Sequence, residues 1–304
     1  MGVEIIPNFL IGGVAAGGTS LLANALIQHP DIFLPAEMRP EPHYFYKSWE
    51  YAKGSNYYMD KWFSGVQQEK ATGERSSSYL FDPTVAGKVK EFNPSMKWIF
   101  MLRNPIERTW GNYRYTVLGG LERLSFWDAL QQEEERINNQ EGIWAEIQPY
   151  NYTGRGFYYA QLQPFFQNFD SSQILLLRSE DVAKNSQVNL EKIYDFLGVE
   201  GGFVPEMPPN HTAVSVKNRE VQADAREYFK DRFDLFVEGI RREQDPIDLI
   251  NSEDDRVWYE KFKENLVGTK KKMPTDCREY LQNLFAEDIN KLSSVVEFET
   301  KDWN

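Results

Sequence analysis

The sequence predicts an α/β fold of three layers, α/β/α, in which helices cover both faces of a central parallel sheet. In the first half of the chain, short apolar runs alternate with longer segments whose apolar residues recur at helical spacing. That alternation is typical of a parallel α/β sheet. The chain has 304 residues, 41% of them hydrophobic, which is enough for one large core. We therefore expect a single domain over residues 1–304.

The elements of this domain can be read in order. Buried strands are expected over residues 9–13, 97–102 and 173–177. Helices are expected over residues 19–28, 106–117, 156–169 and 188–197. Pro105 favours a helix start, and Gly198 is a usual residue after a helix end.

The composition changes beyond about Pro205. Residues 206–220 are expected to form a loop. Residues 221–262 are polar and charged, with acidic residues around Glu243 to Asp255, and we interpret them as a helical insertion. A last amphipathic helix is expected over 274–293, with Pro274 at its start.

Charge and cysteine content exclude several classes of function. The formal net charge is −12, which argues against nucleic acid or a heavily sulfated polymer as a partner, since both require many basic contacts. Cys277 is the one cysteine, so no intramolecular disulfide forms. No run approaches the roughly 20 apolar residues of a membrane helix, and the N-terminus lacks a basic leader region. We expect a cytoplasmic protein without a membrane span; its oligomeric state stays open.

A glycine-rich turn joins the first strand to the first helix in the segment GGVAAGGTSLL, residues 12–22. Glycines allow close backbone approach, and free amides at a helix start attract anions. The alternative is a tight turn without a ligand. A nucleotide kinase is disfavoured because the segment lacks the Gly-Lys-Ser/Thr of the nucleoside-triphosphate loop. We therefore expect an anion bound without a metal.

Five blocks, in order, resemble sulfotransferases that use 3′-phosphoadenosine-5′-phosphosulfate (PAPS), especially the carbohydrate branch: the heparan-sulfate N- and 3-O-sulfotransferases and their bacterial relatives. The blocks are FLIGGVAAGGTSLLANALIQHPDIFLP, PEPHYFY, GERSSSYL, IFMLRNPIERTWGNYRY and GFYYAQLQPFFQNFDSSQILLLRSEDV. The resemblance implies a P-loop-like sulfotransferase fold and PAPS as co-substrate, with no metal. It also implies transfer of a sulfuryl group to a hydroxyl or amine of a saccharide, glycolipid or small metabolite.

The resemblance also implies which residues bind the donor. The 5′-phosphosulfate would lie on Ala16, Gly17, Gly18, Thr19 and Ser20. Arg103 would bind the 3′-phosphate. Asn112 stands beside the position of a family serine that binds this phosphate, and Lys271 stands at the position of a family arginine that does so. A strand-end arginine without a ligand and a solvated lysine loop are the alternatives for Arg103 and Lys271.

For catalysis, the resemblance makes Glu41 the general base, with His43 as the second candidate. A histidine packed against neighbouring aromatic rings is the alternative for His43. Arg75 matches a lysine near the transferred group, and an ion pair with Glu74 or Glu41 is its alternative. Most aromatic residues over 44–63 and 150–169 should be core, some could line an acceptor cleft, and Tyr158 is expected near the adenine.

Three positions depart from the family pattern. Ala16 stands where the family has a lysine. Pro40 replaces a second lysine, with Arg39 beside it, and Gly111 replaces a serine beside Asn112. A non-catalytic protein that binds 3′-phosphoadenosine is therefore the alternative function.

Overall fold

The structure, a computed structural model, describes residues 6–36, 40–206, 214–241, 246–268 and 271–303. The chain forms two compact units, each described by itself. The first comprises Met1–Arg108, Gly154–Pro208 and Gln282–Asn304, and the second comprises Thr109–Thr153 and Pro209–Leu281. One domain with an insertion at 221–262 stays a prediction.

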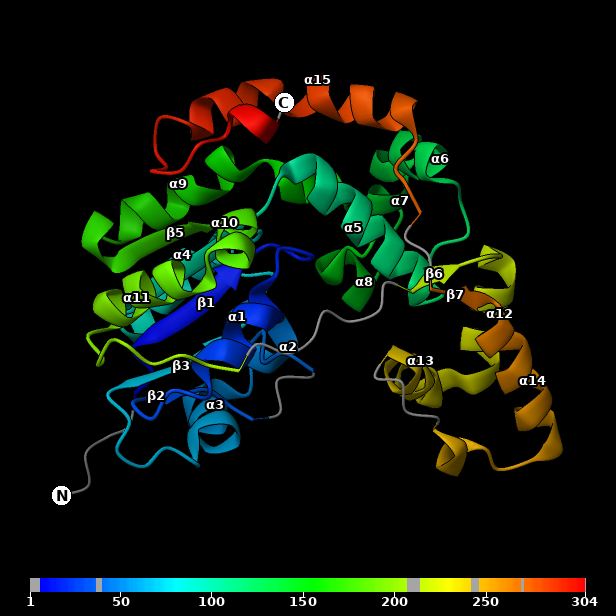
Figure 1. Cartoon of the computed structure of the whole chain (residues 1–304), viewed down its shortest axis with the longest axis horizontal. Helices are drawn as coiled ribbons and strands as arrows, with labels where there is room; N and C mark the ends of the chain where they lie inside the picture. The colour runs from blue at the N-terminus through cyan, green and yellow to red at the C-terminus, as the bar shows by residue number, and fades with distance from the viewer. Residues whose placement is uncertain (1–5, 37–39, 207–213, 242–245, 269–270, 304) are drawn as a thin grey trace. The chain divides into compact units, whose positions relative to one another are not determined.

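A five-stranded sheet organises the first unit (Figure 1). All of its strand pairs are parallel, and the order is β2-β3-β1-β4-β5. The strands are β1 (Phe9–Gly13), β2 (Ile32–Phe33), β3 (Ala71–Arg75), β4 (Lys97–Leu102) and β5 (Ile174–Arg178). The parallel sheet and the α/β class are as predicted. The sequence reading missed β2 and β3.

Strand β1 lies at the centre of this sheet, with β3 on one side and β4 on the other. The chain first builds the β3 side and then crosses to the β4 side. A reversal of this kind leaves a crevice at the carboxyl ends of the two neighbouring strands, where α/β proteins bind ligands. The segment that follows β1 therefore opens at the position where a ligand is expected.

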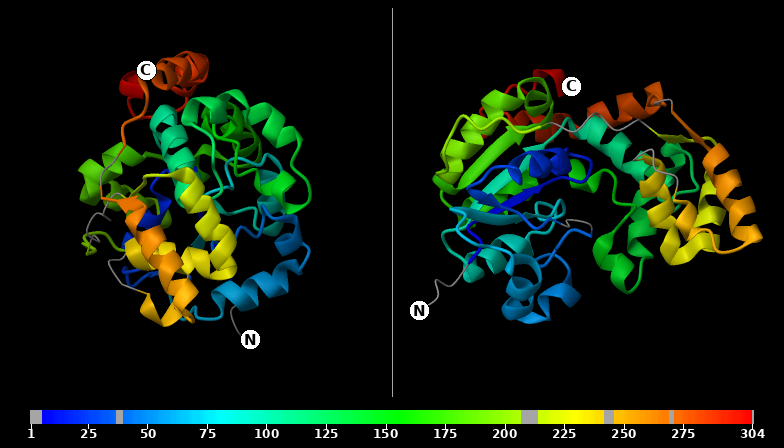
Figure 2. Two further views of the ribbon diagram at one scale, coloured as in Figure 1. Left: turned by 90° about the vertical axis from the view of Figure 1, so that its right-hand side faces the viewer. Right: turned by 60° about the horizontal axis from the view of Figure 1, so that its bottom comes forward.

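Helices cover both faces of the sheet, which gives three layers (Figures 1 and 2), and the side chains of β4 alternate between these two faces. Ile99 and Met101 belong to a core with α1 (Thr19–Leu26) and α11 (Ser186–Leu197). Trp98 and Phe100 point the other way and pack edge-on against Phe165 of α9 (Tyr158–Asn168). This is the period-two alternation of a strand buried on both faces.

The predicted helices of this unit are present, with shifted ends. Helix α1 ends at Leu26, two residues before the predicted end. Helix α9 starts at Tyr158, because residues Gly154–Gly156 form a 3₁₀ turn. Helix α11 ends before Gly198, whose φ of 76° is the left-handed value expected after a helix end.

The first unit has further helices, of which α3 and α4 contribute to an aromatic cluster. They are α2 (Ser48–Tyr51), α3 (Gly54–Phe63), α4 (Thr84–Phe92) and α10 (Ser179–Lys184), with 3₁₀ turns at Ser171–Gln173 and Lys301–Trp303. Tyr44 stacks on Tyr58, and Phe45 packs edge-on against Tyr58 and Phe92. All but Phe92 are buried, so these aromatic residues are core, as expected.

The second unit is mostly helical. It contains most of α5 (Pro105–Leu118), then α6 (Phe126–Gln131), α7 (Glu133–Asn138), α8 (Ile143–Ile147), α12 (Arg219–Phe229), α13 (Phe233–Arg241), α14 (Glu253–Glu264) and the start of α15 (Thr275–Leu292). Its 3₁₀ turns are Lys230–Arg232 and Ile247–Leu249. Residues 221–262 are thus largely helical, as predicted, although 242–245 lie outside the described residues.

The loop predicted over 206–220 is partly wrong. Ser215–Val216 (β6) pairs antiparallel with Leu266–Val267 (β7), and α12 begins at Arg219. Asn218 caps α12, because its side chain accepts hydrogen bonds from the amides of Glu220 and Val221. A two-residue strand is too short to produce an alternating pattern. Residues 207–213 of the predicted loop lie outside the described part of the chain.

None of the described helices combines the length and the apolar character that crossing a membrane requires.

Candidate active site

The turn between β1 and α1 requires positive φ angles, which most residue types avoid. The φ angles are 119° at Gly13, 65° at Ala16 and 89° at Gly18. A side chain at Gly17 would approach the Val14 carbonyl oxygen to 2.8 Å. Left-handed backbone suits glycine and is strained for alanine. The turn therefore holds a fixed, tight shape.

The start of α1 presents amide groups that are free to bind an anion. Within the described residues, the backbone amides of Gly18, Thr19 and Ser20 donate no hydrogen bond to a protein acceptor. The first amides of a helix have no partner inside the helix, and the helix dipole favours negative charge there. Thr19 is buried and Ser20 half-buried. The predicted anion loop thus has the geometry that such a loop needs.

Arg103 follows β4 and joins this loop. Its Nη1 donates a hydrogen bond to the Ala16 carbonyl oxygen at 2.9 Å. The Tyr158 hydroxyl donates to the Arg103 carbonyl oxygen at 2.8 Å, and the Tyr158 ring is fully buried. Tyr158 therefore holds Arg103 in place, and its place near an adenine stays a prediction.

Ser179 is a loop neighbour that sequence reasoning missed. It begins α10 directly after β5, and its Oγ lies 2.9 Å from the position of a Cβ at Gly18. The next residue, Glu180, accepts a hydrogen bond from the Asn104 amide at 3.0 Å. Ser179 could have been found from the sequence because it comes just after a predicted strand, and ligand-binding residues cluster at the carboxyl ends of parallel strands.

Glu41 is surrounded by groups that stabilise its negative charge. Its Oε1 pairs with Arg75 Nη1, and its Oε2 lies 3.1 Å from His43 Nε2. Ser77 donates to Oε2 through its amide at 2.7 Å and its hydroxyl at 2.9 Å. The structure thus brings together the three predicted catalytic residues, Glu41, His43 and Arg75. Arg75 forms the ion pair with Glu41 that was named above as its alternative role. Ser77 lies in the quoted block GERSSSYL but was not singled out.

These contacts set the protonation states. Burial raises the pKa of Glu41, but hydrogen bonding and charge from His43, the Arg75 guanidinium and the Ser77 amide together lower it to about 2. Burial lowers the pKa of His43, and Glu41 only partly opposes this. At neutral pH the site holds a carboxylate, a guanidinium and a neutral imidazole. Because a carboxylate only accepts, His43 Nε2 carries the proton that it donates to Glu41.

The backbone of His43 has a φ of 47°, which is strained for a residue with a side chain. The His43 amide donates a hydrogen bond to Ser76 Oγ at 2.8 Å, and Ser76 Oγ donates to Glu74 Oε2 at 2.9 Å. Glu74 is fully buried. A buried carboxyl group thus helps to hold the turn that places His43 against Glu41.

Glu74 should make folding stability depend on pH. Burial raises its pKa to about 7, although Tyr79, Ser76 and Tyr58 hydroxyls lower it and the Glu41 charge raises it. The folded chain then keeps a proton that the unfolded chain releases above pH 4.5. Stability supplied by this group is full below pH 4.5 and falls by about 3 kcal/mol as the pH rises to 7. Glu74→Gln should remove this fall.

Urea unfolding of wild type and Glu74→Gln at pH 4.5 and pH 7 tests this prediction. The opposite trend from His43 is common to both proteins and cancels in the comparison. Glu91→Gln, an exposed glutamate of α4, is the control and should keep the wild-type pH dependence. Equal pH dependence in wild type and Glu74→Gln would contradict the prediction.

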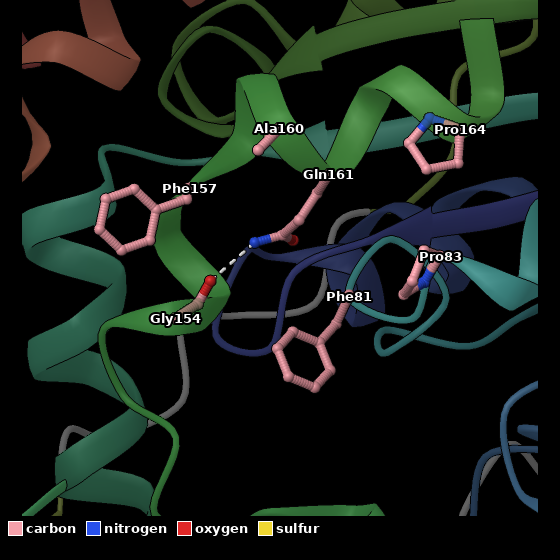
Figure 3. A pocket seen from close by; sticks show the side chains of 7 residues that line it. All are labelled: Phe81, Pro83, Gly154, Phe157, Ala160, Gln161 and Pro164. Atoms are coloured by element: carbon pink, nitrogen blue, oxygen red, sulfur yellow. Dashed lines mark hydrogen bonds between the residues drawn. The ribbon is translucent and has the colours of Figure 1, made fainter. Parts of the chain in front are cut away.

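A pocket of about 240 Å³ lies in the first unit (Figure 3). It is lined by Phe81, Pro83, Gly154, Phe157, Ala160, Gln161 and Pro164. Arg155 lies beside it, with its guanidinium 4.1 Å from the Phe81 ring centre and its nitrogen atoms 3.4 Å from Tyr46 Oη and 3.5 Å from Ser78 Oγ. Arg155 was not predicted, because 77 residues separate it from Ser78 and no local pattern marks it.

Two predicted donor-binding residues belong to the second unit. Asn112 lies on α5, where its carbonyl oxygen accepts the Thr116 hydroxyl at 3.0 Å. Lys271 is exposed, and its amide donates to Ser215 Oγ at 3.4 Å. Their partnership with Arg103 stays a prediction. Arg39, the neighbour of Pro40, lies outside the described residues.

Comparisons with known proteins agree with the five sequence blocks. A solved sulfotransferase from Alicyclobacillus acidocaldarius superimposes with a TM-score of 0.71 at 26% identity, covering 98% of this chain and 99% of that one. Mouse heparan sulfate glucosamine 3-O-sulfotransferase 3A1 is 27% identical over 199 residues, 66% of this chain and 47% of the relative. Human bifunctional heparan sulfate N-deacetylase/N-sulfotransferase 2 is 25% identical over 202 residues, 64% of this chain and 22% of the relative.

The chain spans about half the length of the 3-O-sulfotransferases that it matches. The family model described as "Sulfotransferase domain" matches residues 7–291. The fold and the family are therefore those that the sequence blocks predicted, and the chain belongs to the sulfotransferase domain family.

Proposed function

We propose that this protein transfers a sulfuryl group from PAPS to a hydroxyl or amine of a saccharide, glycolipid or small metabolite. One observation carries the proposal: the anion loop follows β1, and Arg75 and Ser77, which bind Glu41, lie at the carboxyl end of the neighbouring strand β3. Ile11 of β1 lies opposite Arg75 of β3, and the Ser76 amide donates to the Ile11 carbonyl oxygen at 3.0 Å. Neighbouring strands lie about 4.8 Å apart, which supports a single site for an anionic sulfuryl donor and a carboxylate base.

The described residues fit the phosphosulfate end of PAPS. Free amides at the start of α1, on a turn where side chains at Gly17 and Gly18 would meet neighbouring atoms, suit a group that approaches the backbone closely. The Arg103 fork suits a phosphate. PAPS supplies the sulfuryl group. The loop amides would hold its 5′-phosphate, Arg103 its 3′-phosphate, and the amides would stabilise the charge that develops as the sulfuryl group departs.

Glu41 would take the acceptor proton. The acceptor oxygen forms a bond to sulfur while the bond from sulfur to the 5′-phosphate oxygen breaks. The proton passes to Glu41, and the electron pair of the broken bond leaves with 3′-phosphoadenosine-5′-phosphate (PAP). A carboxylate with a pKa near 2 is a weak base. An acceptor hydroxyl that replaces Ser77 or His43 at Oε2 removes part of this stabilisation and makes Glu41 more basic.

A thermal-shift comparison of PAP, ADP and ATP with magnesium tests the donor site. PAP and ADP differ in where they carry phosphate, so the first comparison reports the 3′-phosphate site. A ligand at about 100 times its Kd adds roughly 2.7 kcal/mol of stability, which raises the midpoint by a few degrees in a chain of this size. We expect this rise with PAP alone. No shift with PAP, or a shift only with ATP and magnesium, would contradict the proposal.

One observation favours a second candidate, a protein that binds 3′-phosphoadenosine without turnover. Ala16 brings no charge to the loop, and Arg75, which could replace the missing lysine, is paired with Glu41. PAP binding would then survive while transfer is lost. A PAPS turnover assay separates the two, since ordinary enzyme rates from the native chain would exclude the second candidate.

A further inference from the structure

The pocket beside α9 is lined by uncharged, mostly apolar residues. Its lining consists of two phenylalanines, two prolines, an alanine, a glycine and Gln161, so no lining side chain carries a charge (Figure 3). A flat ring packs well against aromatic and proline surfaces.

Gln161 is the one polar side chain of the lining. Its Nε2 donates to the Gly154 carbonyl oxygen at 2.8 Å, and because that oxygen only accepts, the nitrogen must be the amide atom that faces it (Figure 3). Its Oε1 is buried, and within the described residues it accepts no hydrogen bond. A buried acceptor without a donor is unfavourable. A ligand N–H or O–H would give this oxygen its missing hydrogen bond if the side chain turned toward the pocket.

The pocket lies near the Glu41 site along the chain. Phe81 lies four residues after Ser77, which binds Glu41, and the turn between them is closed by a hydrogen bond from the Phe81 amide to the Ser78 carbonyl oxygen at 3.2 Å. Four residues span at most about 14 Å. Arg155 bridges the two places, because it covers the Phe81 ring and reaches Ser78. A molecule of modest length can occupy the pocket and reach Glu41.

We propose that the acceptor carries an uncharged, largely apolar ring beside an N–H or O–H group, and that this ring binds between Phe81 and Phe157 next to Gln161. The proposal rests on the proposed function and names the acceptor class. Apolar cavities of about 150 Å³ already hold benzene, so a pocket of about 240 Å³ has room for one ring or two fused rings.

Binding of two glucosides without PAPS tests the ring site. The probes are 2-naphthyl β-D-glucopyranoside and methyl β-D-glucopyranoside. They carry the same sugar and differ only in the group on its anomeric oxygen, which is a naphthyl ring in one and a methyl group in the other. Isothermal titration should give a Kd at least tenfold lower for the naphthyl compound, because burying a ring is favourable in proportion to its apolar area. Equal affinity for the two glucosides would overturn the proposal.

Matched variants on α9 locate the effect. Ala160→Leu adds bulk to the pocket at an exposed, helix-compatible position and should raise the Kd for the naphthyl glucoside at least tenfold. Gln161→Leu should raise it about three- to tenfold through loss of one hydrogen bond. Gln163→Leu puts the same residue two positions further along, outside the lining, and should leave the Kd unchanged. Circular dichroism checks that each variant is folded.

Transfer from PAPS to the same probes separates the two proposals. Faster sulfation of the naphthyl glucoside, lost in Ala160→Leu, supports both. Ring binding that Ala160→Leu weakens, without transfer to either glucoside, supports the pocket and counts against the proposed function. Equally fast transfer to both glucosides, or binding that Ala160→Leu leaves unchanged, overturns the ring pocket while the proposed function stands.

Discussion

Glu41→Gln is expected to lower kcat/KM for PAPS-dependent sulfation by about 10²–10⁴-fold, the usual contribution of a positioned general base. The substitution keeps the size of the side chain but removes the proton acceptor. It also leaves Arg75, whose side chain is 4% exposed, without its carboxylate partner. Initial-rate measurements with radiolabelled PAPS and the best acceptor available give the comparison.

The control for this variant is Glu50→Gln. Glu50 also forms an ion pair, with Lys53 at 2.6 Å, but it lies on α2 apart from the Glu41 cluster and should leave the rate unchanged. PAP affinity should be similar in wild type and Glu41→Gln, because Glu41 does not belong to the anion loop. An active Glu41→Gln together with an inactive His43→Asn would transfer the role of base to His43.

The pH profile gives a second reading of the same assignment. With Glu41 as base, kcat/KM should show no loss from this group as the pH falls from 8 to 5, because its pKa lies near 2. With His43 as base, the rate should fall as the imidazole gains its proton, at a pH below the ordinary 6.5 because burial lowers the pKa of His43.

Arg103→Met is expected to weaken PAP binding by about 10- to 100-fold, the effect of losing hydrogen bonds from a charged donor to a phosphate. ADP lacks the 3′-phosphate, so its affinity should change less. The variant also loses the hydrogen bond to the Ala16 carbonyl oxygen. The ratio of PAP affinity to ADP affinity is therefore the quantity to measure, since loosening of the loop affects both ligands.

Arg256→Met is the matched control for Arg103→Met. Arg256 has a side chain that is 63% exposed and pairs only loosely with Glu253, at 3.7 Å, so its loss should leave both affinities unchanged. If Arg103→Met weakened PAP and ADP by the same factor, Arg103 would act on the shape of the loop rather than on the 3′-phosphate.

The sequence predicted the sheet where a strand is long and buried. Strands β1 and β4 have their predicted ends, because both faces of each are covered and every residue is apolar or glycine except Lys97 at the start of β4. Strand β3 (ATGER) was missed, because it carries two charged residues that nonetheless lie buried. Their burial depends on Glu41 and on three hydroxyl groups from outside the strand, so local composition does not reveal it.

The candidate site was predictable where its residues are close in sequence and not where the fold brings distant residues together. The loop residues are consecutive, and the resemblance covers Glu41, His43, Arg75 and Arg103. Ser77, Ser179 and Arg155 act through contacts made over 36, about 160 and 77 residues of chain, which only the fold brings together. The strained φ angles of Ala16 and His43 were equally hidden, since neither residue type announces left-handed backbone.

The central place of β1 also bears on how this protein folds. Its first strand hydrogen-bonds to residues 73–75 on one side and to residues 97–101 on the other. The residues of β1 leave the ribosome long before these partners, so this apolar strand stays unpaired during part of synthesis. Contacts this distant along the chain slow folding and leave apolar surface open to aggregation. The anion loop then takes its shape only after β4 has docked, because Gly13 pairs with Met101 and Arg103 anchors Ala16.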